Sequence, residues 1–382
     1  MSIVLTLNAG SSSLKFGVYR AAAEPELIAR GQVDSIGPQA VLDIEGRKER
    51  IGEADHAGAV QAILSALEPV LDGGAVTAVG HRVVHGGAEF SAPLRLDDGS
   101  IAALQALVPL APLHQPHNLA AVHAARAAFP DAVQFACFDT AFHHGHPFVN
   151  DTFALPRRFY EAGVRRYGFH GLSYDYITSV LARDFPDLHK GRVVIAHLGN
   201  GASMCAVHAG RSLGSTMGFS ALDGLPMGTR CGQLDPGVLL YLMGQGMGVD
   251  EITNLLYRES GLKGLSGISH DMRTLLESRD PRAAEALDYY VFRTRRELGA
   301  MAAVLGGIDA MVFTGGIGEN AAPIRARILE DTEFLGLSVD PRRNARNARN
   351  IAQGPKPVLV IPTDEERVIA RAASRWLTRH QL

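Results

Sequence analysis

With 382 residues, of which 46 % are hydrophobic and 20 % charged, the chain has the composition of a folded globular protein and the length for two or three domains. Its net charge of −3 gives no electrostatic reason to bind nucleic acid or an anionic membrane surface, and prolines interrupt its most apolar stretch, IAALQALVPLAPL, so no membrane span is predicted. The three widely spaced cysteines and the lack of a basic leader at the amino terminus favour a soluble cytoplasmic protein.

The first predicted element is a pair of strands in LTLNAGSSSLKFGVY, residues 5–19. Apolar residues alternate, stop at the small polar loop 8–13, and resume at Leu14. The loop is longer and richer in serine than a tight turn needs. Lys15 lies just past it, after Leu14, and could supply a positive charge.

Strands and helices alternate along the rest of the chain. Strands are expected within 75–87, 132–143, 193–210, 310–316 and 357–363, and helices over 57–71, 101–108, 118–129, 173–184, 281–305 and 365–379. The basic segment 342–350 (RRNARNARN) is expected to be a surface turn. This alternation is typical of an α/β protein.

The opening stretch has a counterpart in the second half, VVIAHLGNGASMCAVHAG, residues 193–210. Superposing the two places Gly201 on Gly10 and Ser203 on Ser12, an offset of 201 − 10 = 191 residues, which is half of 382. A repeat of that length indicates a duplicated domain rather than a solenoid. We expect one domain over 1–150, joined by the carboxyl-terminal helix 366–382, and a second over 151–365.

A third glycine-rich segment, AMVFTGGIGENAAPIRARILE (310–330), runs from a strand through a loop into a helix with Pro323 in its first turn. Glycine-rich turns at strand ends expose backbone N–H groups that bind phosphate oxygens. Three such loops favour a phosphate-binding site. The pattern G-x-x-x-x-G-K-[ST] is absent, so a P-loop enzyme is not expected.

Gly316 to Ala321 also matches the dinucleotide fingerprint G-x-G-x-x-G/A, and Asp340 follows at a suitable distance. An NAD-dependent dehydrogenase is therefore an alternative. It is the weaker one, because the residues after Asp340 are too few to complete a six-stranded dinucleotide-binding sheet.

Ten motifs together identify a family resemblance. In chain order they are NAGSSSLKF, GHRVVHGG, PLHQPHN, FDTAFH, YGFHG, HLGNGAS, MGTRCGQLDPG, SHDMR, TGGIGEN and PTDEE. They resemble the acetate kinase family over the whole chain. The resemblance implies two duplicated ribonuclease-H-like domains of the actin/Hsp70/sugar-kinase type around a nucleotide cleft. It also implies reversible phosphoryl transfer from ATP to acetate with Mg²⁺ (or Mn²⁺), in a homodimer.

The resemblance assigns the reacting residues. Arg82 would bind the acetate carboxylate, for which its planar fork is suited. His170 and Arg230 would stabilise charge on the transferring phosphoryl group, with His114 in support. Asp139 is treated by the family as an essential acid. Because acetate is already deprotonated at pH 7, we expect Asp139 to position Arg230 or a metal-bound water rather than to act as a base.

The remaining assignments concern the metal, the nucleotide and the acyl group. Asn8 and Glu365 would hold the metal, although the sequence does not separate Glu365 from Glu366. The nucleotide would contact a larger set: Lys15, His197, Leu198, Gly199, Asn200, Gly201, Asp271, Met272, Arg273, Gly315, Gly316, Ile317, Gly318 and Glu319.

The acyl pocket would comprise Val84, Leu113 and Phe169, while Ala221 stands where the family has proline. Proline-to-alanine replacement would make this pocket slightly roomier. A propionate or butyrate kinase of the same family therefore stays open, as does a slowly hydrolysing ATPase of the actin or Hsp70 type.

Overall fold

The computed structural model describes residues 2–10, 13–71 and 74–380, and it divides the chain into two compact units. Unit 1 comprises Met1–Phe142 and Asp364–Leu382, and unit 2 comprises His143–Thr363. The borders predicted from the sequence lie after residues 150 and 365. The segment after Phe142 goes with unit 2 because His143 packs against Gly168 and hydrogen-bonds to Ser212.

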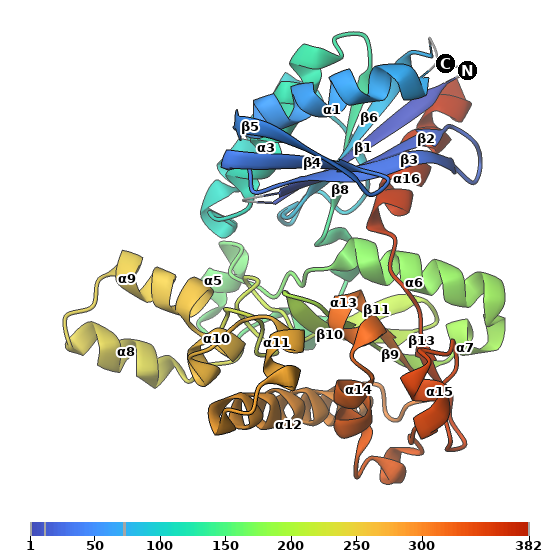
Figure 1. The fold of residues 1–382 in the computed structure, drawn as a ribbon. Helices are drawn as coiled ribbons and strands as arrows, with labels where there is room; N and C mark the ends of the chain where they lie inside the picture. The colour runs from blue at the N-terminus through green and yellow to red at the C-terminus, as the bar shows by residue number, and fades with distance from the viewer. Residues whose placement is uncertain (1, 11–12, 72–73, 381–382) are drawn as a thin grey trace. The chain divides into compact units, whose positions relative to one another are not determined.

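Unit 1 is built on an eight-stranded sheet in the order β5-β4-β3-β2-β1-β6-β8-β7 (Figure 1). The strands are β1 (Ile3–Ala9), β2 (Ser13–Arg20), β3 (Glu26–Asp34), β4 (Gly37–Ile44), β5 (Arg47–Ala54), β6 (Val76–Val83), β7 (Leu94–Arg95) and β8 (Val133–Phe138). The helices are α1 (His56–Leu71), α2 (Asp98–Ala106), α3 (Gln115–Ala128) and α16 (Glu365–His380). β1, β6 and β8 run parallel, whereas β1 to β5 form an antiparallel ribbon.

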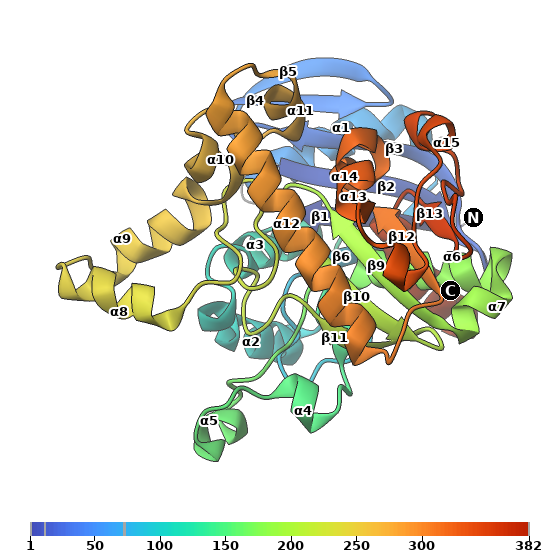
Figure 2. The ribbon, with the colours of Figure 1, turned by 90° about the horizontal axis from the view of Figure 1, so that it is seen from below.

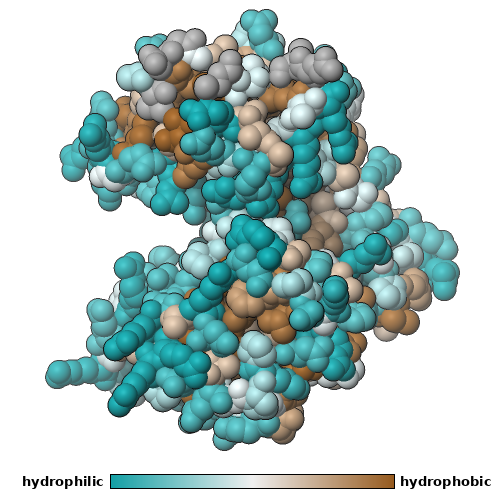
Figure 3. All heavy atoms as spheres, turned by 90° about the vertical axis from the view of Figure 1, so that its right-hand side faces the viewer, coloured by the Kyte–Doolittle hydropathy of each residue, from teal (hydrophilic) through white to brown (hydrophobic). Residues whose placement is uncertain are grey.

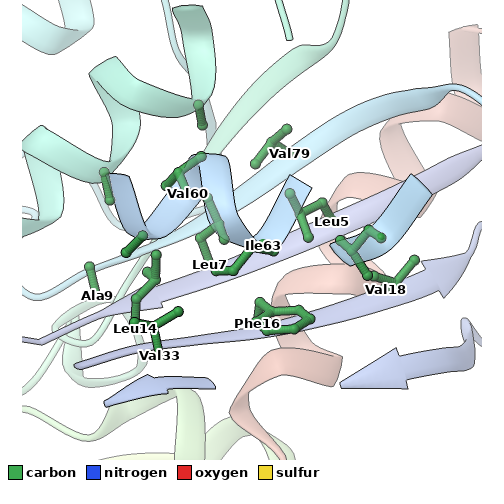
Figure 4. Close-up of a cluster of buried hydrophobic side chains, with 14 of the residues drawn as sticks. Leu5, Leu7, Ala9, Leu14, Phe16, Val18, Val33, Val60, Ile63 and Val79 are labelled. Carbon is green, nitrogen blue, oxygen red and sulfur yellow. The ribbon is translucent and has the colours of Figure 1, made fainter. Parts of the chain in front are cut away.

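The core of unit 1 lies on both faces of β1, every residue of which is buried. Successive side chains of a strand point to opposite faces. Leu5 and Leu7 therefore pack with Ile63 of α1 on one face (Figure 4), while Val4 packs with Ala370 of α16 on the other. This two-sided burial explains the apolar character of the first strand. On the face of the chain shown in Figure 3, most side chains are polar and apolar side chains lie among them.

Unit 2 contains a five-stranded sheet in the order β11-β10-β9-β12-β13. The strands are β9 (Arg192–Leu198), β10 (Ala202–His208), β11 (Arg211–Ser215), β12 (Ala310–Thr314) and β13 (Val358–Val360). The helices are α4 (Phe148–Asp151), α5 (Arg157–Glu161), α6 (Gly171–Asp184), α7 (Pro186–Lys190), α8 (Pro236–Gly244), α9 (Val249–Asn254), α10 (Gly261–Ser266), α11 (Met272–Glu277), α12 (Pro281–Val304), α13 (Gly315–Asn320), α14 (Ala322–Leu329) and α15 (Pro341–Ala345). Short 3₁₀ turns occur in both units, at Val108–Leu110, Ala141–His143 and Glu333–Leu335. A π turn lies at Leu255–Glu259.

Five strands of the unit 1 sheet have the same topology as the sheet of unit 2. In unit 1 the order β3-β2-β1-β6-β8 contains two antiparallel pairs followed by two parallel pairs, and β11-β10-β9-β12-β13 of unit 2 repeats this arrangement. The match confirms the predicted α/β fold with a duplicated domain. It also shows that the dehydrogenase alternative is wrong, because a dinucleotide-binding sheet is mostly parallel, whereas β10 pairs antiparallel with both β9 and β11. Asp340, which that alternative assigned to a ribose, caps α15 through the Arg343 amide.

The six predicted helices are confirmed as α1, α2, α3, α6, α12 and α16, with ends shifted by at most three residues. α12 begins where the sequence suggests, at the Asp280 cap followed by Pro281. The prediction of a loop at residues 315–318 is wrong, because these residues lie in helix α13. Gly315 enters that helix with φ +76°, where a Cβ would lie 2.8 Å from the Leu198 carbonyl oxygen. The segment 342–350, expected to be a turn, begins inside α15.

Candidate active site

The first group of predicted site residues lies at one edge of the unit 1 sheet. Asn8, Arg82 and Asp139 lie at or just beyond the carboxyl ends of the parallel strands β1, β6 and β8, which meet at one edge. Arg82 Nε donates to Asp139 Oδ1 at 3.0 Å and Nη2 donates to Oδ2 at 2.5 Å. Arg82 Nη1 donates to Asn8 Oδ1 at 3.0 Å. The fold thus joins three motifs that are far apart in the sequence.

The Arg82–Asp139 pair is a bidentate ion pair in a largely buried setting, since the two side chains are 20 % and 2 % exposed. Burial disfavours the guanidinium, but attraction from Asp139 and Glu365 outweighs it and raises the pKa of Arg82. Among the described residues, these hydrogen bonds use three of the five guanidinium N–H groups. Two N–H groups are left for a ligand.

Two carboxylates at the start of α16 approach the same place. Asn8 Nδ2 lies 3.5 Å from Glu365 Oε2 and 3.4 Å from Glu366 Oε1, and Glu365 Oε2 lies 3.8 Å from Arg82 Nε. Burial, with repulsion from Asp139 and Glu366, raises the pKa of Glu365 to about 7 although Arg82 opposes this. Both glutamates stay candidates for the metal, with Glu365 the one also near Arg82.

The serine-rich loop is described only in part, because Ser11 and Ser12 lie outside the described residues. Lys15 is exposed on β2 directly opposite Asn8. Its charge lowers the pKa of Glu365, as one of the smaller influences on that group. Lys15 is therefore near the metal candidates.

A residue of the PLHQPHN motif, Asn118, stabilises this edge of the sheet through two hydrogen bonds to the backbone. Asn118 Nδ2 donates to the Ala9 carbonyl at 2.7 Å, and its Oδ1 accepts from the Val84 amide at 2.9 Å. Asn118 thereby joins the ends of β1 and β6. Of the predicted acyl-pocket residues in unit 1, Val84 is buried and Leu113 half-buried. Asn118 was not among the residues predicted from the sequence, where its only signal is its place in the motif.

The second group of predicted residues lies in unit 2 around His170. This residue precedes α6 with φ 59° and ψ 24°, a left-handed conformation that is uncommon for residues other than glycine. Its Nδ1 pairs with Ser203 Oγ at 2.9 Å, and its ring stacks on His197 with centroids 4.2 Å apart. Ser203 also hydrogen-bonds to the Tyr174 hydroxyl. Ser203 and Tyr174 were not singled out from the sequence as groups that hold His170.

Arg230 approaches the same place. Its Nη1 donates to the Ala221 carbonyl at 3.0 Å. A Cβ on Gly201 would lie 3.2 Å from His170 Nε2 and 3.3 Å from Arg230 Nη2, so the glycine leaves room between the two side chains. The structure therefore brings His170, Arg230 and the glycine-rich turn after β9 together. The predicted partner of Asp139 was Arg230 or a metal-bound water, whereas the partner observed in unit 1 is Arg82.

The other predicted nucleotide residues surround the ends of β9 and β12. His197 Nδ1 pairs with Ser173 Oγ at 2.8 Å, and Ser173 Oγ accepts from Thr363 at 2.9 Å. Glu319 Oε1 accepts from the Gly315 amide at 2.9 Å and the Thr363 amide at 3.1 Å. Glu319 thus joins α13 to the segment after β13. Ser173 and Thr363 are further residues that sequence reasoning missed.

Residues 271–273 form the start of α11. Asp271 Oδ1 accepts from the Arg273 and Thr274 amides, which lowers the pKa of this carboxyl. Met272 is buried, whereas Arg273 is exposed. Asp271 is therefore a helix cap in this structure, and Arg273 is the member of the trio with an exposed side chain.

Two features are absent from residues 2–10, 13–71 and 74–380. No helix there has the length and apolarity to cross a membrane. No group of three or more His, Cys, Asp or Glu side chains in these ranges has the arrangement of a metal site. A cation with few protein ligands, completed by water and substrate oxygens, remains compatible with the second result.

Comparison with known proteins gives consistent results along the whole chain. The family model described as the acetokinase family matches residues 3–371. The chain is 54 % identical to an acetate kinase of Methylocella silvestris, with 96 % of each chain covered, and 50 % identical to one of Nitrobacter hamburgensis, with 97 % and 95 % covered.

Solved structures agree. A propionate kinase from Francisella tularensis superposes with a TM-score of 0.91 at 34 % identity, covering 97 % of this chain and 99 % of that one. Porphyromonas gingivalis acetate kinase superposes with a TM-score of 0.89 at 37 % identity, covering 99 % and 100 %.

Proposed function

Because the chain belongs to the acetokinase family, we propose that it transfers the γ-phosphoryl group of ATP reversibly to acetate, giving acetyl phosphate and ADP. The observation that carries this proposal is the identity of 50 % or more with curated acetate kinases over nearly the full length. Roles in this transfer are proposed below for the residues of the two groups, each from the chemistry of its own side chain.

Acetate binding is assigned to Arg82. A carboxylate acceptor and a triphosphate are both anions, so the enzyme must hold the acetate with a cation. The two remaining N–H groups of Arg82 would donate to the two carboxylate oxygens. Asp139 holds the guanidinium from its other edge, which supports a positioning role for this acid. Acetate needs no proton removed, so no base is required.

Phosphoryl transfer is assigned to direct in-line attack by an acetate oxygen on the γ-phosphorus, with the bond to the β-phosphate oxygen breaking. Negative charge is spread over the equatorial oxygens during transfer. Arg230 and the imidazole of His170 both reach the space beside Gly201 and would donate to those oxygens.

The metal is proposed to be Mg²⁺. Hard divalent cations of this kind take one or two carboxylates, with waters and phosphate oxygens completing the shell. Glu365 or Glu366, beside the Asn8 amide, fits this sparse donor set. When bound, Mg²⁺ would neutralise charge on the phosphates.

Nucleotide binding is assigned to unit 2. The segments 197–201 and 315–319, with residues 271–273, would contact the phosphates, ribose and base. The left-handed Gly315 and the side-chain-free Gly201 allow close backbone approach. Lys15 of unit 1 would supply a further charge to the phosphates.

A propionate kinase is the second candidate. The Francisella tularensis structure that superposes well on this chain is a propionate kinase, and Ala221 replaces the family's proline in the predicted acyl pocket. We nevertheless place acetate first, because the curated relatives with the higher identities are acetate kinases.

The test is to incubate the protein with ATP, Mg²⁺ and acetate and to trap acyl phosphate with hydroxylamine. We expect hydroxamate to form, with ADP released only when acid is present. Release of ADP without acid would instead indicate an ATPase of the actin or Hsp70 type. Absence of hydroxamate with acetate, propionate and butyrate would contradict the kinase proposal.

A homodimer is proposed as the assembly. In unit 2, α8 buries none of its residues and exposes Leu240 (71 %), Tyr241 (64 %) and Met243 (55 %), and it extends with α9 away from α12 (Figure 2). Such an apolar surface favours association.

Light scattering after size exclusion tests the assembly. Leu240→Glu should halve the mass, whereas the control Phe334→Glu, at another exposed apolar residue of unit 2, should leave it unchanged. A wild-type monomer would contradict this proposal. A cytoplasmic location stays a prediction from the cysteine content.

A further inference from the structure

His143 lies against the loop that carries His170. This histidine ends the FDTAFH motif, is 2 % exposed, and has no role in the chemistry proposed above. A Cβ on Gly168 would lie 2.6 Å from Cγ and Cδ2 of His143, so the YGFHG backbone rests directly on the imidazole. Gly168 also has φ +74°, a conformation that favours glycine.

A directed set of hydrogen bonds fixes the imidazole. His143 Nε2 donates to the Phe169 carbonyl at 2.9 Å. Burial, with repulsion from His146, lowers the pKa of His143 to about 3, so the ring is neutral and its Nδ1 accepts from Ser212 Oγ at 2.9 Å. Ser212 Oγ in turn accepts from His146 Nε2 at 2.7 Å and from the Cys205 thiol at 3.2 Å. The neutral His143 tautomer that carries its proton on Nε2 is consistent with all these hydrogen bonds.

The hydrogen bond from His143 holds Phe169, and the next residue, His170, has a strained backbone conformation. The Phe169 carbonyl belongs to the peptide bond that leads into His170, whose φ of 59° is costly for a side chain with a Cβ. Such a conformation persists only when its surroundings hold it. The hydrogen bond from His143 acts on this peptide bond, while Ser203 acts on the His170 ring.

We propose that His143 is a positioning residue for phosphoryl transfer: its Nε2–H group and its ring hold the peptide bond between Phe169 and His170, so that the His170 imidazole points beside Gly201 and Arg230. The proposed role of His143 runs through this peptide bond and needs no contact with a substrate. This inference rests on the proposed function, because its kinetic consequence is measured on acyl phosphate formation.

The kinetic test compares two substitutions. His143→Phe keeps a ring against Gly168 but removes the donor, whereas His143→Gln keeps an amide N–H near the position of Nε2. A displacement of about 1 Å in a catalytic group costs up to roughly 100-fold in rate. We expect His143→Phe to lower kcat about 10- to 100-fold while both KM values change less than about threefold, and His143→Gln to recover most of kcat. His208→Phe, the same change at an exposed histidine of unit 2, is the matched control and should retain wild-type kinetics.

Selective labelling reports the hydrogen bond without using the reaction. Only two Phe-His pairs occur in the sequence, 142–143 and 169–170. Labelling phenylalanine carbonyl carbon with ¹³C and histidine amide nitrogen with ¹⁵N therefore gives two signals in the wild type and one, from residues 169–170, in each His143 variant. Loss of the bond should move this ¹³C signal upfield in His143→Phe, and His143→Gln should keep it near the wild-type position.

The outcomes separate the two proposals. If the wild type forms no acyl phosphate but the carbonyl signal moves as expected, the function is wrong and the positioning contact stands. If kcat of His143→Phe stays within twofold of wild type, or if His143→Gln loses as much as His143→Phe, the positioning role is overturned. Should thermal unfolding show that His143→Phe does not fold, Ser212→Ala replaces it. This variant removes the hydroxyl that orients the ring, and an unchanged kcat there would also overturn the proposal.

Discussion

At the scale of single residues, Arg82 combines a proposed binding role with a structural one. Its guanidinium is the ionic partner of Asp139, whose side chain is 2 % exposed, and it is also the proposed site for acetate. Removal of one member of a buried pair leaves the other charge unpaired, which is costly. Loss of Arg82 should therefore affect both substrate affinity and stability.

Arg82→Ala should raise the KM for acetate tens- to hundreds-fold, because hydrogen bonds to charged groups contribute about 1.5–3 kcal/mol each. It should also lower the free energy of unfolding by about 3 kcal/mol. Steady-state kinetics and urea unfolding measure the two effects. Arg82→Lys, which keeps the charge but not the fork, should restore part of the stability and less of the affinity. A rise in the KM for ATP with acetate affinity unchanged would contradict the assignment.

The acyl pocket supplies a second prediction at this scale. One methylene group is worth only about 1–3 kcal/mol in discrimination, so acetate should be used about tenfold better than propionate, and butyrate poorly. Ala221→Pro keeps the carbonyl that Arg230 contacts and should widen the preference for acetate. Val84→Ala should narrow it. Values of kcat/KM for the three acids decide the matter, and equal or better use of propionate by the wild type would reverse the order proposed here.

At the scale of elements, one buried arginine connects three short helices, α13, α14 and α15. Arg325 of α14 is 0 % exposed and donates to the Gly318 and Glu319 carbonyls of α13 and to Asn344 of α15. Burial lowers its pKa to about 10. This single side chain therefore holds the end of α13, which contains residues of the proposed nucleotide site.

Arg325→Met should lower the free energy of unfolding by about 2–4 kcal/mol, because buried carbonyl groups lose their donors. It should also raise the KM for ATP more than that for acetate, since α13 loses its support. Arg325→Lys, the matched control, reaches fewer acceptors and should give a smaller change in both quantities. Equal KM changes for the two substrates would count against a specific effect on α13. Urea unfolding and steady-state kinetics are the measurements.

At the scale of the whole molecule, buried histidines make stability depend on pH. Burial lowers the pKa of His81 to about 4, against an ordinary value near 6.5, and His81 pairs with Gln134 at 2.8 Å. His143 has a shift of the same sign in unit 2. Below about pH 6.5 the unfolded chain therefore binds protons that the folded protein does not.

The free energy of unfolding should accordingly fall as the pH is lowered from about 6.5 towards 4, by up to about 1.4 kcal/mol per pH unit for each such histidine. His81→Gln should reduce the slope of the free energy of unfolding against pH by the contribution of one titrating group, up to about 1.4 kcal/mol per pH unit. Urea unfolding at a series of pH values measures it. Identical slopes in the variant and the wild type would show that His81 titrates normally in the folded state.

The local sequence was sufficient for six helices and for the duplicated fold, but it did not predict β3, β4 and β5 or helices α8 to α11. Apolar periodicity located the six predicted helices, because burial of one face imposes that spacing. The repeat at half the chain length anticipated the two sheets of equal topology. The loop at 315–318 was misjudged, because glycine favours turns locally while backbone hydrogen bonds and packing beside β9 form a helix there.

The sequence by itself determined the fold class and the family, and it predicted a set of site residues, because motifs and periodicity are local properties of the chain. Only the tertiary structure decided which of these residues are partners. Asp139 pairs with Arg82, Glu319 joins two backbone amides, and Ser203 and His143 hold the His170 loop. These contacts join residues separated by 26 to 57 positions, apart from the Gly315 amide four residues before Glu319. Their geometry depends on how strand ends and loops meet in space, which no spacing in the sequence specifies.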